Sequence, residues 1–350
     1  DAAICAALMS SKRQEFIDEL NAEYELIRSL YNNRQVHDML PLDQARANHF
    51  HFDTHAADIV APSFLGTKTI TMPLQDIVPF IDWTFFFSAW DLKGISYPAI
   101  LTDENKGTEA TMLFNEAKQI LQHIIDEKLL TPKAVVGFFA ANSTGDDIEL
   151  CEKSGSQAIA GKFFNYRQQT LQPNGNANLC LSDFVAPKTS GNSDYVGLFA
   201  LTAGLEVDEL VASYKEQGDE YSAIMVRTIA DRIAEAFAEK LHYMVRSSLW
   251  GYAPNEPEDV AQILKTNYRG RRMAIGYPAC PDHSQKTTLF ELLDAEKELG
   301  VSLTESYMMC PVSSICGLFF AHPELQYFGV GDVDEAQKKD FEQRKAPYRK

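Results

Sequence analysis

Several segments of the chain repeat apolar residues every three or four positions, the spacing of a helix with one buried face. The first such helix is predicted to begin at Ser10 or Ser11 and to end near Tyr31. Further helices are predicted at 109–129, 206–217, 221–248 and 284–299, with a charged helix at the end of the chain. The sequence therefore predicts helices at both ends of the chain, one at 109–129 and three more between residues 206 and 299.

Short apolar runs separated by turn residues predict β-strands between these helices. The run 134–139 is typical of a buried strand. Further strand-like runs lie at 147–151, 158–165, 178–184, 195–201, 315–320 and 327–333. Because most of them follow one another without an intervening helix, antiparallel pairing is favoured over repeated βαβ units. The stretch 32–71 is polar and predicts irregular structure.

These elements predict an α+β fold with a largely antiparallel sheet and helices packed around it. No segment rich in Pro, Gly or Ser divides the chain, so residues 32–350 are expected to form one structural unit. Residues 1–31 are interpreted as a linker and helix leading into it. The apolar start of the chain is short and lacks preceding basic residues, which favours a cut from a longer chain or a trimmed junction over a signal peptide.

Composition narrows the class of protein. A hydrophobic content of 45% and a charged content of 23% in 350 residues are typical of a folded protein, and no apolar run predicts a membrane span. The net charge of −17 argues against a nucleic-acid partner, since phosphate binding needs a cationic face. The six cysteines are scattered without a Cys-x-x-Cys pair, which predicts reduced thiols, no metal site and a cytoplasmic location.

The segment 268–283 is the richest in candidate chemistry. Arg272 stands four residues before the run Gly276-Tyr277-Pro278-Ala279-Cys280-Pro281. Glycine allows backbone to approach a ligand closely, and an arginine on such a frame suits a carboxylate. The alternative for Gly-Tyr-Pro alone is an ordinary surface loop.

This run resembles the S-adenosylmethionine-binding motif of the activation domain of cobalamin-dependent methionine synthase. Other blocks are similar to the same family, in the family's order: 81–87, 167–170, 183–188, 250–256, 303–306, 322–323 and 326–328. The matching blocks lie between about residues 15 and 344. The resemblance implies a single C-shaped domain that binds S-adenosylmethionine.

The resemblance also implies roles for particular residues. Arg272 would bind the ligand's carboxylate, with Arg271 as the alternative if the loop register differs. The ligand would be wrapped by backbone and rings of the motif, with Tyr277 nearest the departing methyl group. The residues of this stretch are Ala274, Gly276, Tyr277 and Ala279. Gly276 is expected to be glycine because a Cβ would block that approach.

Further residues are assigned by the resemblance. Asp82 would accept hydrogen bonds from the ligand's amino group or ribose, and its alternative role is a helix cap. Tyr327 and Phe328 would contact the ligand, or else belong to a strand core. On the helix 221–248, Glu235 and Asp231 point away from the apolar stripe. Glu235 is a possible ligand contact and Asp231 a possible contact to a cobalamin domain, and a solvated face is the alternative.

Some residues depart from the family pattern or suggest other chemistry. Met273 and Ile275 stand where the family has prolines, and Phe85 replaces another, which predicts a less constrained loop. Cys280 and His283 suggest a thiol hydrolase, but no third orienting group follows. A Rossmann-type methyltransferase lacks its glycine-rich turn. The histidines His49, His51 and His55 allow a metal site, although a His-rich surface segment is favoured.

The function implied by the resemblance is reactivation of a cobalamin enzyme. The domain would present the methyl group of S-adenosylmethionine to inactive cob(II)alamin, with an electron from flavodoxin or a flavoprotein reductase. The chain shows no cobalamin-binding motif, so cobalamin would be held by another domain or subunit and the isolated chain would bind ligand without turnover. No side chain needs to act as a general acid or base. The alternatives are a non-catalytic docking module and a self-contained methyltransferase with another acceptor.

Overall fold

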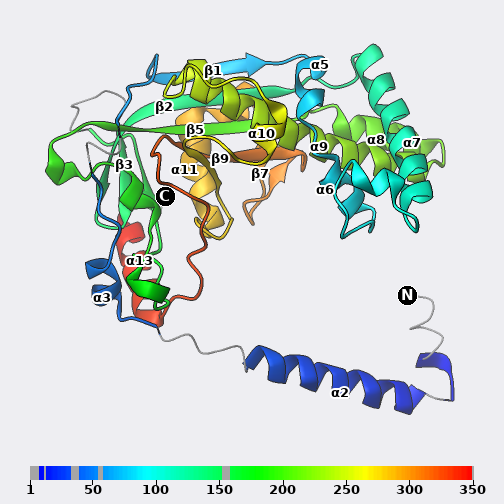
Figure 1. Cartoon of the computed structure of the whole chain (residues 1–350), viewed down its shortest axis with the longest axis horizontal. Coiled ribbons are helices and arrows are strands. Elements are labelled where there is room, and N and C mark those ends of the chain that lie inside the picture. Colours follow the sequence, from blue (N-terminus) through cyan, green and yellow to red (C-terminus); the bar gives the residue numbers. More distant parts are fainter. Residues whose placement is uncertain (1–7, 12, 33–38, 54–57, 152–157, 349–350) are drawn as a thin grey trace.

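The computed structural model describes residues 8–11, 13–32, 39–53, 58–151 and 158–348. Figure 1 shows the body of the molecule as an arch, with a long sheet at its centre, a group of helices at one end and α13 at the other. This shape and the mixture of helices with a curled antiparallel sheet confirm the predicted α+β, C-shaped fold.

The sheet has seven antiparallel strands in the order β4-β3-β2-β5-β9-β6, with β1 paired to β2 beside β3. The strands are β1 (Gly66–Thr71), β2 (Lys133–Thr144), β3 (Asp147–Cys151), β4 (Gly161–Phe164), β5 (Asp194–Thr202), β6 (Arg271–Ala274) and β9 (Ser314–Phe320). Strand β2 is long enough to pair with β1 along its first half and with β3 along its second. A separate hairpin joins β7 (Ser302–Leu303) to β8 (Met309–Cys310). The strand β6 is an edge strand, which matters for the site described below.

Both faces of the central strands are buried, which explains the nearly unbroken apolar runs in β2 and β5. Alternate residues of a strand point to opposite faces. Accordingly, Val136 and Phe138 belong to the apolar cluster beneath α9, whereas Val135 and Phe139 belong to the cluster beneath α11. The sheet is therefore the middle layer between two groups of helices.

The helices cover the sheet and extend it at one end. They are α2 (Arg13–Asn32), α3 (Leu42–Ala47), α5 (Leu74–Ile77), α6 (Trp83–Ala89), α7 (Gly107–Asp126), α8 (Val207–Glu216), α9 (Glu220–Met244), α10 (Val260–Leu264), α11 (Lys286–Leu293), α12 (Ala295–Leu299) and α13 (Glu335–Lys345). The 25-residue α9 begins with a cap, in which the Asp219 carboxylate accepts from the Ser222 N–H, and ends in a π-helical turn at Val245–Leu249. In α2, Tyr24, Leu26 and Ile27 remain exposed, so this helix is not part of either core cluster. Among the described residues, no helix is both long and apolar enough to cross a membrane.

Three sequence predictions of local structure are wrong. The segment 178–184 is not a strand, because Leu181–Phe184 forms a 3₁₀-helix in which the Asp183 carboxylate accepts from the Cys180 N–H. The segment 327–333 forms no strand, because the Gly329 carbonyl accepts from the Gln168 side chain and the Val330 N–H donates to the Pro278 carbonyl. The stretch 32–71 contains α3 and β1 rather than irregular structure alone.

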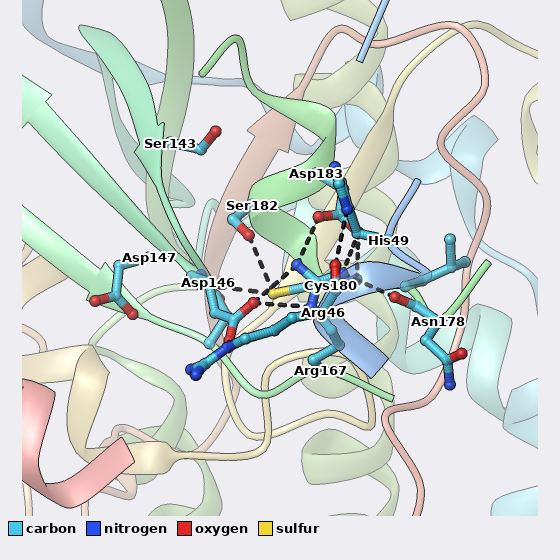
Figure 2. Close-up of polar contacts among 12 residues, drawn as sticks. Arg46, His49, Ser143, Asp146, Asp147, Arg167, Asn178, Cys180, Ser182 and Asp183 are labelled. Carbon is cyan, nitrogen blue, oxygen red and sulfur yellow. Dashed lines mark hydrogen bonds and ion pairs between the residues drawn. The ribbon is translucent and has the colours of Figure 1, made fainter. Parts of the chain in front are cut away.

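A largely buried network of ion pairs connects segments that lie far apart in the sequence (Figure 2). The Arg167 guanidinium donates to Asp146 at 2.8 Å and to both oxygens of Asp183 at 2.7 and 2.8 Å. Arg46 of α3 binds the other oxygen of Asp146 at 2.7 Å and also Asp340 of α13 at 2.7 Å. Burial alone would raise the pKa of Asp146, but the two arginines outweigh it and lower the pKa. The network therefore holds α3, the β2–β3 turn and α13 in place.

Candidate ligand site

A cavity of about 760 Å³ opens at the edge strand β6. Its walls come from α9, the strands β6 and β9, the loop after β6, the β7–β8 hairpin and the segment before α13. The lining residues are Glu235, Arg272, Met273, Ala274, Ile275, Tyr277, Pro278, Ala279, His283, Lys286, Met308, Met309, Ser314, Ile315, Cys316, Tyr327, Phe328 and Gly329. The volume lies in the range of cavities that hold small-molecule ligands.

Strand alternation places Arg272 at the α9 face of the sheet. Its Nη2 atom donates to the Glu239 carboxylate of α9 at 2.9 Å. Its Nη1 atom is buried and has no hydrogen-bond partner among the described residues. Burial lowers the pKa of Arg272, but Glu239 and its neighbours outweigh this and raise it, so the guanidinium stays charged. Of the two terminal nitrogens of Arg272, Nη2 is therefore hydrogen-bonded, and Nη1 makes no hydrogen bond with the described residues.

Arg271, the alternative in sequence, points elsewhere. Its Nη1 atom donates to the backbone carbonyls of Tyr268 and Gly270, each at 2.6 Å, and its Nη2 atom donates to the Gln326 side chain. The side chains of Arg271 and Arg272 leave opposite faces of the strand. The structure therefore favours Arg272 as the arginine of the cavity.

The loop after β6 is a tight turn closed by backbone hydrogen bonds. The Gly276 N–H donates to the Cys280 carbonyl at 2.7 Å, and the Cys280 N–H donates to the Tyr277 carbonyl at 2.9 Å. Gly276 has a φ of +97°, and a Cβ there would meet the His283 ring at 2.3 Å. The space that the missing side chain leaves is thus filled by His283. We expected the space beside Gly276 to admit a ligand, and the structure gives a different reason for the glycine.

His283 is held in turn by a buried lysine. Lys286 donates to His283 Nδ1 at 3.1 Å and to the Tyr307 carbonyl of the β7–β8 hairpin at 3.0 Å. Its side chain is almost fully buried and lines the cavity. The sequence analysis missed Lys286, although its position three residues after His283 at a helix start was a signal that the two share a face. This pair links the Gly276 turn to the hairpin.

The carboxylates predicted on α9 separate in the structure. Glu235 lines the cavity and makes no hydrogen bond or ion pair with the described residues. Asp231 accepts a hydrogen bond from Ser313 Oγ at 2.7 Å and is not among the lining residues. Tyr327 and Phe328 line the cavity from an extended segment rather than from a strand.

Asp82 does not lie on the wall of the cavity. Its carboxylate caps α6 by accepting from the Thr84 N–H at 2.9 Å. Helix α6 packs against α9, where Arg232 lies over the Phe85 ring. Asp82 is therefore placed at the flank of the helix that carries Glu235.

The motif residues that replace the family's prolines are used as core residues. Met273 and Ile275 are buried in the cluster beneath α11. The Gly276 turn is held by His283 and by the Val330 N–H, which donates to Pro278. Packing therefore fixes the chain at positions where proline would restrict φ.

The alternative chemistries find little support in the geometry. Burial raises the pKa of the Cys280 thiol to about 12, so it is not an activated nucleophile. The rings of His49 and His51 lie edge to face 4.5 Å apart, and His55 lies outside the described residues. Within the described ranges, no group of three or more His, Cys, Asp or Glu side chains is arranged to hold a metal ion.

The fold and the cavity define a ligand-binding α+β domain of the activation-domain type. A family model described as vitamin B12-dependent methionine synthase, activation domain, matches residues 73–346. A solved structure described as the MetH reactivation domain bound to AdoHcy is 44% identical, with a TM-score of 0.85 over 88% of this chain and 94% of that one. The chain belongs to the activation-domain family of vitamin B12-dependent methionine synthases.

Proposed function

We propose that the cavity at β6 binds S-adenosylmethionine and presents its methyl group for reductive remethylation of cob(II)alamin held by another domain or subunit. The observation that carries the proposal is that Arg272 lines a cavity of about 760 Å³ and that its buried Nη1 atom has no hydrogen-bond partner among the described residues. The similar reactivation domain was solved with AdoHcy, the product that the same transfer would leave. Residues 32–350 would act as one unit, with 1–31 leading into it.

The carboxylate and the ammonium group at the amino-acid end of the ligand would each meet a side chain of opposite charge in the cavity. The Nη1 edge of Arg272 would bind the carboxylate, since arginine and carboxylate form strong charge-assisted hydrogen bonds. Glu235 would accept from the ammonium group, because its own carboxylate makes no hydrogen bond with the described residues. These two side chains come from different elements, which fixes the orientation of the ligand.

The rest of the ligand would lie along the turn and the segment before α13. Ala274, Gly276, Tyr277 and Ala279 offer backbone and ring contacts, and Tyr327 and Phe328 offer aromatic faces. Tyr277 is 63% exposed at the mouth of the cavity and would lie nearest the methyl group.

Asp82 would bind the amino group or ribose from the flank of α9. The substitution Asp82→Asn separates this role from the cap of α6, because an amide oxygen still accepts from the Thr84 N–H but the carboxylate charge is lost. Weaker binding of S-adenosylmethionine by that variant, with unchanged stability in urea, would support the ligand contact.

This chain's own work would be positioning. S-adenosylmethionine, when bound, supplies a methyl group on a sulfonium centre and leaves as S-adenosylhomocysteine. The lining residues orient that group, and burial raises the pKa of the Cys280 thiol to about 12, which keeps the thiol protonated. The chain would therefore bind its ligand without turnover when separated from the cobalamin partner.

Exposed apolar and aromatic side chains at the mouth of the cavity suit contact with another protein domain. Tyr277, Met308 and Tyr327 line the cavity and are exposed, and large exposed apolar groups together mark interaction surfaces. We propose that the cobalamin-binding domain docks here. The electron would come from flavodoxin or a flavoprotein reductase.

The test is calorimetric titration of S-adenosylmethionine into the chain and into Arg272→Ala. Losing one charge-assisted partner costs about 1.5–3 kcal/mol, so affinity should fall roughly ten- to a hundredfold. Arg227→Ala is the matched control, because Arg227 lies on the first part of α9, is half exposed, does not line the cavity and makes only a 3.6 Å ion pair with Asp208 of α8. Absence of binding to the unaltered chain would refute the proposal and favour a docking module.

Transfer of the methyl group to a small acceptor without cobalamin would instead favour a self-contained methyltransferase. Liquid chromatography of S-adenosylhomocysteine formed by the chain alone decides between the two. We expect none above the background rate of ligand breakdown.

A further inference from the structure

The pairing of Arg272 with Glu239 has a direct bearing on ligand selectivity. Glu239 lies on α9 one turn beyond Glu235, so the two carboxylates share a face of the helix. Glu235 lines the cavity, whereas Glu239 is not among the lining residues and accepts from the Arg272 Nη2 atom at 2.9 Å. Two glutamates on one face thus make different contacts.

Most of the surface of the Arg272–Glu239 pair is covered by the protein. The side chain of Arg272 is 11% exposed and that of Glu239 is 18% exposed. The Tyr268 hydroxyl is buried nearby and, like Arg272 Nη1, has no hydrogen-bond partner among the described residues. Burial and then Glu239 raise the pKa of Tyr268, which keeps this hydroxyl protonated. Arg272 is therefore hydrogen-bonded at its Nη2 atom, whereas its Nη1 atom, the neighbouring Tyr268 hydroxyl and Glu239 Oε2 make no hydrogen bond with the described residues.

We propose that Glu239 is a positioning residue, which holds the Nη2 edge of Arg272 so that the Nη1 edge faces the cavity and selects ligands that carry an α-carboxylate. The proposal rests on the proposed function of the cavity. An arginine side chain has several rotatable bonds, and its flat guanidinium binds well only when its plane is fixed. A hydrogen bond to one edge supplies that constraint and leaves the other edge for a ligand carboxylate.

Two ligands separate this role from a general effect on the fold. S-adenosylhomocysteine carries the amino-acid carboxylate, and 5′-methylthioadenosine keeps the adenosine and the sulfur but lacks the amino-acid end. Binding of each is measured calorimetrically with the unaltered chain, Glu239→Ala and Glu239→Gln. Glu258→Ala is the matched control, because it removes an ion pair with Lys240 of α9 that does not touch the cavity.

We expect Glu239→Ala to weaken S-adenosylhomocysteine about tenfold, the usual effect of misplacing a charge-assisted hydrogen bond. The affinity for 5′-methylthioadenosine should stay within about twofold, since that ligand does not use Arg272. Glu239→Gln should recover most of the loss, because its amide oxygen still accepts from Nη2. Glu258→Ala should change neither affinity.

Equal weakening of both ligands by Glu239→Ala would show a merely structural role and overturn the proposal. Tighter binding of S-adenosylhomocysteine would show that Glu239 competes with the ligand for Arg272, which also overturns it. If Glu239→Ala does not fold, Glu239→Asp carries the same comparison, since its shorter side chain cannot hold Nη2 in the same place. Failure of the unaltered chain to bind either ligand would overturn the proposed function itself and this inference with it.

Discussion

At Gly276 a single added methyl group should disturb the site strongly. Its φ of +97° is one that L-residues rarely adopt, and holding alanine there costs about 1–3 kcal/mol. The added Cβ would also lie 2.3, 2.6 and 2.8 Å from three atoms of the His283 ring. His283 cannot easily withdraw, because Lys286 holds its Nδ1 atom at 3.1 Å. Overpacking of this kind adds about 1–3 kcal/mol.

We therefore expect Gly276→Ala to lower the free energy of unfolding by roughly 2–6 kcal/mol. Gly145→Ala is the control, since Gly145 has a φ of +63° but open space where its Cβ would be. That variant should lose only the backbone part, about 1–2 kcal/mol. The difference between the two variants measures the collision with His283.

Urea denaturation of Gly276→Ala, His283→Ala and the double variant tests this explanation. Removing the ring should relieve the collision, so the two substitutions should be non-additive by about 1–3 kcal/mol in the direction of rescue. Titration with S-adenosylhomocysteine should show a parallel loss and recovery of affinity. The reasoning is refuted if Gly276→Ala is no less stable than Gly145→Ala, or if His283→Ala and Gly276→Ala are simply additive.

Three further outcomes are expected. Arg167→Leu should lower the free energy of unfolding by about 3–5 kcal/mol in urea denaturation, because it removes the ion-pair partner of the buried Asp183 and one of the two arginines that bind the buried Asp146, whereas Arg28→Leu in an exposed pair of α2 should change it by less than about 1 kcal/mol. Burial raises the pKa of Asp194 to about 6, above the unfolded value of about 3.9, so its contribution to stability is present below pH 4 and is lost as the pH rises through 6. The melting temperature of Asp194→Asn, relative to that of the unaltered chain, should therefore rise between pH 4 and pH 7. Iodoacetamide at neutral pH should label the exposed Cys310 and spare the buried Cys280 in the folded chain, as read by peptide mass spectrometry.

Much of the fold could be predicted because its elements are long and periodic. The helix 221–248 corresponds to α9 and its π-helical turn, and the apolar run 134–139 corresponds to the centre of β2. Both depend on local patterns of apolar residues, which a sequence displays directly. The predicted helix 284–299 is divided at Asp294, whose φ of 50° interrupts it between α11 and α12.

Two of the three wrongly predicted segments take their shape from contacts with residues outside the segment. The conformation of 178–184 depends on Asp183 reaching Arg167, and that of 327–333 on Gln168 and Pro278. A strand-like composition cannot reveal such contacts.

In the candidate site, too, some residues could be identified from the sequence and others only from the folded structure. The family resemblance brought attention to Arg272, Glu235 and Tyr327, which do line one cavity. Glu239 went unnoticed because Arg272 comes close to it only in the folded chain, and Lys286 because its spacing of three residues from His283 was not considered. The explanation for Gly276 also needed the fold, since His283 fills the space beside it.

The length of α9 has a mechanical consequence. At about 1.5 Å per residue, a helix of this length spans roughly 37 Å, and it connects the helical end of the arch, where it packs on α7 and α8, with the cavity. Glu235 and Glu239 lie on its second half, and the first break in its regular backbone pattern is the π-helical turn beyond them. The helix is therefore continuous from its contacts with α7 and α8 to both carboxylates. A displacement of α9 at its contacts with α7 and α8 would therefore move Glu235 and Glu239 together.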